Sequence, residues 1–243
     1  MFVVMVSGMA TVSGAIMAVY AAMGVSAQHI LISALMAKPA SILIAKIIYP
    51  KVEQSATEHG ASADQVNSAK NVFDAISAGT SDGLGLALNV GAMLIVFISL
   101  MALVNALLGN CSVLINYLAG TNLPLLSLNT VFGYLFSPFA YLLGLTGSEA
   151  LQAAELLGTK VTINELVAFD KMVHMAVLSE RTQTILTYAL CGFSNFSCIG
   201  IQVGGIGALV PERRAWLTEL GLMAVLGSSL ANLLSALMVA LLT

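Results

Sequence analysis

The chain has few charged residues: Asp, Glu, Lys and Arg together make up 9% of its 243 positions. Soluble domains carry roughly 25%, so most of this chain's surface is unsuited to water. Apolar residues reach 58%, and several apolar runs attain the roughly 20 residues that a helix needs to cross a bilayer. The composition therefore predicts an all-α polytopic membrane protein.

Other absences exclude several classes of function. The formal net charge of −3 excludes the basic surface that nucleic acids require. Walker loops, HExxH helices and Gly-x-Ser-x-Gly elbows are missing. Cys111, Cys191 and Cys198 lack metal-ligand spacing. We therefore expect no enzyme and no resident cofactor.

Apolar runs and polar intervals divide the chain into six segments. The spacing of Val66, Ala69, Phe73 and Ile76 predicts an amphipathic helix at the membrane surface. In order, we expect two transmembrane helices (1–49), a cytoplasmic polar interval with that amphipathic helix (50–82), a scaffold helix from about Leu84 to Leu108 (83–110), a re-entrant hairpin region (111–180), a broken transmembrane helix (181–210), and a cytoplasmic loop with the last transmembrane helix (211–243).

Two of these regions are interrupted by small and polar residues. Thr182 to Leu209 is long enough to span a membrane, but "CGFSNFSCIG" inside it predicts a broken helix that exposes backbone groups. In the hairpin region, two short segments flank Gly144 and Gly147, and the second carries several charges. Such backbone is tolerated at membrane depth only where protein buries it or water reaches it, which favours a re-entrant hairpin.

Glu165, in "TINELVAF", is the strongest candidate for a functional residue. Burying an ionisable side chain at membrane depth is costly unless it is paired or hydrated, so a residue of this kind is a functional candidate by default. The alternative is that it pairs with Lys160 or Lys171 and merely closes the hairpin. In the broken helix, Asn195 and Ser197 offer hydrogen bonds and Phe193 offers a face for stacking. The alternative there is a kink packed by small residues.

The first span carries a weaker signal of the same kind. In "SGMATVSGA", local unwinding would expose the Thr11 hydroxyl and the Val12 carbonyl to a cation, which prefers oxygen ligands. Close helix packing through small residues is the other interpretation. Basic residues set the orientation: Arg213 and Arg214 place their loop in the cytoplasm, so the C-terminus lies outside the plasma membrane.

Three stretches are similar to motifs of the concentrative nucleoside transporter family: "GTSDGLGLALNVGAMLIVFISLMALVNALLG", "LLGTKVTINELVAF" and "LCGFSNFSCIGIQVGGIGALVPERR". The first part of the chain, from "VSGMATVSGA" at Val6 to Pro50, also resembles the conserved middle region of sequences in that family. The resemblance implies an elevator-type homotrimer that imports nucleosides with Na⁺ or H⁺. The trimer-forming span would be Leu84 to Leu108.

The resemblance also implies roles for individual residues. In the "NE" pair, Glu165 would bind ribose hydroxyls with Asn164 beside it. Phe193 would line the sugar pocket and Asn195 would bond to the ribose. The remaining implied positions are Cys198 at the sugar, next to Ser197, then Ile16 against the base, and Thr11 and Val12 at the cation.

The sequence departs from the family pattern in two ways. It begins where the family would already have three spans and its first hairpin, so we expect a fragment, a truncated gene product or one piece of a split transporter. Cys198 also stands where relatives commonly have a hydroxyl. The alternatives are an ion-coupled carrier of another polar solute, an intramembrane enzyme using Glu165 or Cys198, and a non-transporting membrane subunit.

Overall fold

The computed structural model describes residues 1–50, 71–122, 124–175 and 178–243. Within these ranges all regular elements are helical, which confirms the all-α prediction. In chain order they are α1 (Phe2–Ala10), α2 (Gly14–Ala22), α3 (Ala27–Ile48), α4 (Val72–Ala119), α5 (Leu128–Leu142), α6 (Gly147–Thr162), α7 (Glu165–His174), α8 (Glu180–Leu190), α9 (Phe196–Leu209), the 3₁₀ turn η1 (Pro211–Arg213) and α10 (Arg214–Ala240).

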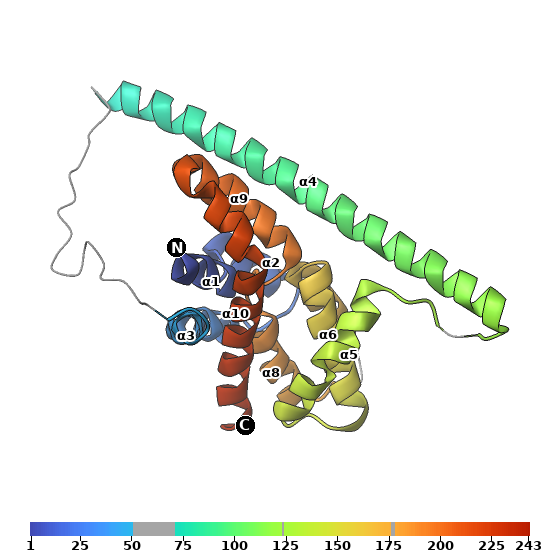
Figure 1. Cartoon of the computed structure of the whole chain (residues 1–243). Helices are drawn as coiled ribbons and strands as arrows, with labels where there is room; N and C mark the ends of the chain where they lie inside the picture. Colours follow the sequence, from blue (N-terminus) through green and yellow to red (C-terminus); the bar gives the residue numbers. More distant parts are fainter. Residues whose placement is uncertain (51–70, 123, 176–177) are drawn as a thin grey trace.

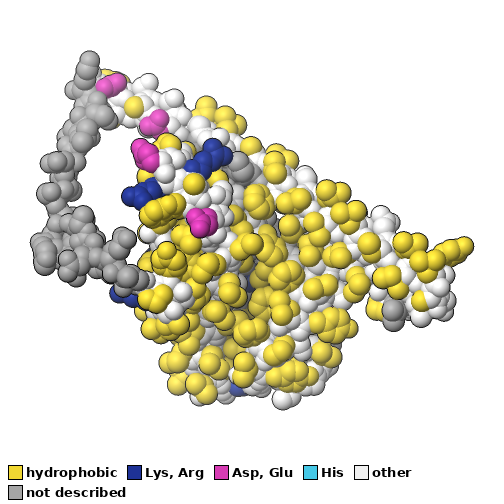
Figure 2. Space-filling view, viewed as in Figure 1, with side chains coloured by type: hydrophobic (Ala, Val, Ile, Leu, Met, Phe, Trp, Pro, Cys, Tyr) yellow, Lys and Arg dark blue, Asp and Glu magenta, His cyan; other side chains and the backbone are white. Residues whose placement is uncertain are grey.

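Four segments of the described chain are long and apolar enough to cross a membrane. They are Phe2–Ala22, Ala27–Ile48, Ile95–Ala119 and Pro211–Ala240. The first combines α1 and α2. Figure 2 shows one face of the molecule covered mainly by hydrophobic side chains, with charged groups gathered toward one end. This surface suits lipid, as the low charge content predicts.

Helix α10 is the central packing element, in contact with α1, α3, α8 and α9 (Figure 1). Its buried face is built largely from Gly, Ala and Ser, which let neighbouring helices approach closely. A Cβ atom on Gly221 would lie 2.6 Å from the Ile199 side chain of α9. One on Gly227 would lie 3.1 Å from Val6 of α1. Small residues thus set the distances between these helices.

Helix α4 lies across the outside of this body and is far longer than predicted (Figure 1). Its 48 residues span about 72 Å at 1.5 Å per residue. The helix begins where the Asn71 side chain accepts a hydrogen bond from the Asp74 N–H (2.9 Å). Phe73 and Ile76 therefore lie in the first turns of α4 and not in a short helix of their own. The other two predicted positions of that helix, Val66 and Ala69, lie outside the described residues.

The region between α4 and α8 has two turns near its middle, where the sequence indicates one. The predicted turn joins α5 to α6, and both Gly144 and Gly147 have positive φ there. A second turn at Ile163–Asn164 separates α6 from α7. The side chain of Asn164 starts α7 by accepting a hydrogen bond from the Val167 N–H (2.9 Å). As a result, Glu165 is the first residue of α7.

A carboxylate joins the start of α6 to the start of α8. Glu149 accepts hydrogen bonds from the Ser179 N–H (2.7 Å), the Ser179 hydroxyl (3.1 Å) and the Thr182 hydroxyl. The Thr182 hydroxyl, followed by the Ser179 N–H, lowers the pKa of Glu149. The arrangement adds a negative charge to the N-terminus of α8, where the helix dipole favours it.

Two helices are interrupted inside the body, and their breaks meet. One separates α1 from α2 at Thr11–Ser13, and the other separates α8 from α9 at residues 191–195. Gly192 lies at the meeting point with φ +126°, and a Cβ atom there would lie 2.5 Å from the Ala10 carbonyl oxygen. It would also lie 2.6 Å from the Asn232 side-chain nitrogen. The predicted break in residues 181–210 is confirmed.

We predict that Gly192→Ala destabilises the protein by about 3 kcal/mol or more, because it adds both backbone strain and a clash with backbone atoms. Thermal unfolding of the detergent-purified chain would measure this loss. Gly109→Ala is the matched control, since a Cβ atom there meets nothing within 4 Å in helix α4. Equal unfolding temperatures for the two variants would contradict the close contact.

Candidate functional site

Glu165 is buried at the centre of the best-organised polar cluster in the described chain. Its side chain is 5% exposed, and each carboxylate oxygen accepts one hydrogen bond. The Tyr20 hydroxyl donates to Oε1 (3.1 Å), and the Asn195 amide donates to Oε2 (3.0 Å). Three separate elements, α2, α7 and the start of α9, therefore converge on one carboxylate.

Asn195 has two roles at the start of α9. Its side-chain oxygen accepts a hydrogen bond from the Cys198 N–H (2.9 Å), which caps the helix. Its amide nitrogen is thereby turned toward Glu165. The broken helix thus holds a hydrogen-bond donor in a fixed direction inside the body.

The other predicted residues of the break surround this pair. Phe193 is half-buried, and its carbonyl accepts a hydrogen bond from the Asn195 N–H (2.8 Å). Ser197 and Cys198 lie in the first turn of α9, each 4% exposed. The Cys198 thiol is close enough to Glu165 for the two to interact electrostatically. The side-chain oxygen of Asn164 caps α7 directly before Glu165.

The link between α1 and α2 is the second break, next to the one between α8 and α9. Thr11 and Val12 fall in extended backbone between the two helices, as the unwinding hypothesis requires. The Thr11 hydroxyl donates to the Ser7 carbonyl (3.0 Å), so its oxygen lone pairs remain directed elsewhere. Ile16 is half-buried, one helical turn before Tyr20 and hence on the same face of α2.

Tyr20 is the functional candidate that the sequence did not reveal. It is fully buried, and its ring packs against Phe169 of α7 with the centroids 4.6 Å apart. The available signal was a tyrosine in a nearly uninterrupted apolar span, since a buried phenolic hydroxyl usually finds a partner. That partner, Glu165, is 145 positions away in the sequence.

The two lysines that could have paired with Glu165 behave differently. Lys171 forms an ion pair with Glu155 across α6 and α7 (3.4 Å), and its ammonium also lies 3.4 Å from the Thr159 hydroxyl. Lys160 is buried and donates to the Ala189 carbonyl (2.8 Å). Lys160 also interacts electrostatically with Glu165. The side-chain hydrogen bonds to the Glu165 carboxylate in the described chain come from Tyr20 and Asn195 and from neither lysine.

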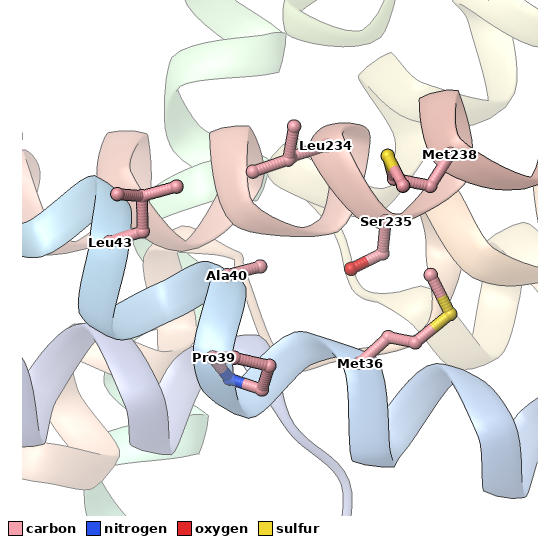
Figure 3. A pocket seen from close by; sticks show the side chains of 7 residues that line it. All are labelled: Met36, Pro39, Ala40, Leu43, Leu234, Ser235 and Met238. Carbon is pink, nitrogen blue, oxygen red and sulfur yellow. The ribbon is translucent and has the colours of Figure 1, made fainter.

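The surface also has a groove that none of the residues of the Glu165 cluster line. It is an apolar groove of about 360 Å³ between α3 and α10, lined by the side chains in Figure 3. The Ser235 hydroxyl in its wall donates to the Ala231 carbonyl of its own helix (3.1 Å). The groove therefore offers little polar chemistry, and the Glu165 cluster remains the candidate site.

Comparison with known proteins relates the whole chain to transporters. Residues 29–240 match the family described as "Na+ dependent nucleoside transporter C-terminus". The chain is 42% identical to the uncharacterized transporter YutK of Bacillus subtilis and 38% identical to the nucleoside permease NupC of Helicobacter pylori. It is 32% identical to the sodium/nucleoside cotransporter 1 of Rattus norvegicus.

These alignments include 97%, 97% and 96% of this chain but 57%, 56% and 38% of the respective relatives. The chain therefore spans about 57% of the length of its bacterial relatives. All three relatives are named as transporters or permeases, and none as an enzyme.

Solved structures give the same relationship. A CNTnw variant in an outward-facing state superposes with a TM-score of 0.85 at 36% identity, over 99% of this chain and 57% of that one. CNTnw in an inward-facing substrate-bound state superposes with a TM-score of 0.74 at the same identity, over 99% and 56%. With a family match over most of its length, this chain belongs to the concentrative, sodium-dependent nucleoside transporter family.

Proposed function

We propose that the chain forms the nucleoside-binding part of a plasma-membrane symporter that imports nucleosides with a cation. The observation that carries this proposal is the buried Glu165 carboxylate held by Tyr20 and Asn195. The names of the Helicobacter and rat relatives support nucleosides as the substrate class.

The geometry of this carboxylate suits a sugar. A carboxylate offers about four acceptor positions, and Tyr20 and Asn195 occupy one on each oxygen. The carboxylate retains capacity for further donors, and two neighbouring ribose hydroxyls could supply them. Phe193 and Ile16, both half-buried, supply apolar surface for the sugar and the base. Asn164 contributes by fixing the start of α7 and hence the place of Glu165.

The coupling ion in this proposal is Na⁺, bound at the link between α1 and α2. The Thr11 hydroxyl and the Val12 carbonyl supply oxygen ligands of the kind that hard cations prefer. The name of the rat relative favours sodium over protons. Because this link touches the α8–α9 break at Gly192, the ion and the nucleoside would each raise the other's affinity.

Transport would proceed by alternating access, with a mobile body moving against α4. The existence of relatives of this fold in outward-facing and inward-facing states supports such a movement. We assign α4 to a scaffold that joins a homotrimer, because many of its apolar side chains, such as Leu88 and Ile95, are more than 60% exposed. In this picture the re-entrant hairpin is the α6–α7 pair and not the pair of segments that flank Gly144 and Gly147, and its tip, Ile163–Asn164, reaches the substrate.

A complete transporter would also need the portion of the relatives that this chain does not match. We propose that this N-terminal portion supplies the other side of the substrate site. We also propose that the exposed basic pair Arg213 and Arg214, at the start of α10, faces the cytoplasm and that the C-terminus lies outside.

We predict that Glu165→Gln lowers uridine uptake about 100-fold or more, since two charge-assisted hydrogen bonds to the sugar would be lost. Uptake would be measured in transport-deficient cells that express the chain joined to the N-terminal part of the Bacillus relative. Glu155→Gln is the control, because Glu155 is exposed on α6. Full uptake by Glu165→Gln would refute the sugar assignment, and competition by sugars or amino acids instead of nucleosides would indicate another carrier.

We predict that Cys198→Ser leaves nucleoside affinity equal or improves it, because a hydroxyl is a better hydrogen-bond partner than a thiol. Inhibition of uptake by increasing uridine would give the affinity in the same cells. Cys111→Ser, at an exposed position of α4, controls for the loss of a thiol. A large loss of affinity in Cys198→Ser alone would mean that the pocket lies elsewhere.

We predict that Thr11→Val raises the Na⁺ concentration for half-maximal uptake about tenfold, the scale expected for damage to a metal site. Thr80→Val is a matched control, since the Thr80 hydroxyl makes the same type of bond, to the Ile76 carbonyl (2.7 Å), on exposed α4. Uptake driven equally well by a proton gradient without Na⁺ would show that the coupling ion is wrongly assigned.

A further inference from the structure

Lys160 carries a buried positive charge that the proposed mechanism has not used. The side chain is 2% exposed, whereas the other lysines and the arginines of the described ranges are partly or largely exposed. Burying an ammonium is costly unless charged or polar groups compensate it. Lys160 therefore needs partners, and they are the Ala189 carbonyl of α8 and Glu165 at the start of α7.

The first partner is the carbonyl end of α8. The Lys160 ammonium donates to the Ala189 carbonyl oxygen at 2.8 Å, one residue before α8 ends at Leu190. The last carbonyls of a helix lack partners in the next turn and carry the negative end of the helix dipole. An ammonium at this position satisfies the carbonyl and opposes the dipole at once.

The second partner is Glu165, which stands on the other side of the same break. Glu165 interacts electrostatically with Lys160 and is bound by Asn195, the residue that caps α9. The α6–α7 pair therefore presents a positive charge to the carbonyl end of α8 and a negative charge to the N–H end of α9. This order of charges complements the dipoles of both half-helices.

The space beside the Lys160 ammonium is too small for a further ligand. A cavity of about 10 Å³ lies between Lys160, Ala189 and the Ser229 hydroxyl of α10, about the size of a single water position. The Ser229 oxygen has no hydrogen-bond partner among the described residues. The space is polar on one side but too small for a hydrated ion.

We propose that Lys160 is a positioning residue for the sugar site, a tethered cation that fixes Glu165 and the α8–α9 break relative to each other. Several transporters place a mobile ion against the carbonyl end of a broken helix. Here the ammonium of Lys160, which is part of the chain, takes the position of that mobile ion. Lys160 does not itself contact the nucleoside. The proposal rests on the nucleoside site proposed above only for its transport readout.

The first test measures the coupling between Lys160 and Glu165 without any substrate. Thermal unfolding of the purified chain would be compared for the wild type, Lys160→Met, Glu165→Gln and the double variant. We expect Lys160→Met to destabilise the protein much more when Glu165 is present than when it is Gln, because only then is an uncompensated charge left buried. An equal effect in both backgrounds would indicate packing alone and overturn the proposal.

The second test separates positioning from folding by kinetics. Lys160→Gln keeps an N–H donor for the Ala189 carbonyl but lacks the charge, so it serves where Lys160→Met does not fold. We expect Lys160→Gln to raise the KM for uridine about tenfold or more, with a smaller change in the maximal rate per transporter at the cell surface. A KM equal to that of the wild type would overturn the proposal.

Lys171→Gln is the matched control for both tests, since it removes a lysine of the same helix pair that is partly exposed. It should change neither the coupling with Glu165 nor the KM. If Glu165→Gln retains full uptake while the unfolding experiment shows strong coupling, the sugar assignment fails and the tethered cation stands. If uptake depends on Glu165 but the coupling is absent, the proposed function stands and the role of Lys160 fails.

Discussion

The interior of this protein contains helix ends whose backbone groups need hydrogen-bond partners, and the rest of the structure depends on how that demand is met. Side chains meet it at three of these ends: Asn164 at the start of α7, Asn195 at the start of α9 and Lys160 at the carbonyl end of α8. Because unpaired backbone groups are costly in an apolar medium, these residues are structural requirements first. The candidate site arises where two of them also engage Glu165, directly by Asn195 and electrostatically by Lys160.

The need to satisfy buried polar groups also explains the position of Glu165. A carboxylate in an apolar region would be unfavourable in isolation, and at the first residue of α7 it benefits from the helix dipole and from two hydrogen-bond donors. Its remaining acceptor positions are oriented before any ligand arrives. Such preorganisation favours a ligand whose donors match the fixed acceptors over one that would have to reorganise the site.

Much of this arrangement could be predicted from local sequence. Long apolar runs indicate α3 and α10, and the polar residues of "CGFSNFSCIG" indicate the break that makes Asn195 available. The features that could not be predicted are contacts between residues far apart in the sequence and the points where helices begin and end. Tyr20 meets Glu165 only through folding, and no local pattern encodes that contact. The turn at Ile163–Asn164 contains no glycine, because the Asn164 side chain starts a new helix there. Helix α4 extends past its apolar run, since polar residues continue a helix once it has formed.

The meeting of the two breaks at Gly192 has a mechanical consequence. Most contacts between helices pass through flexible side chains, which absorb small displacements before they reach the next element. At Gly192 the main chain of one break faces the Ala10 carbonyl of the other with no room for even a methyl group between them. A shift of the link that carries Thr11 and Val12 would therefore move the backbone segment that leads to Asn195 directly, because no flexible side chain lies between the two.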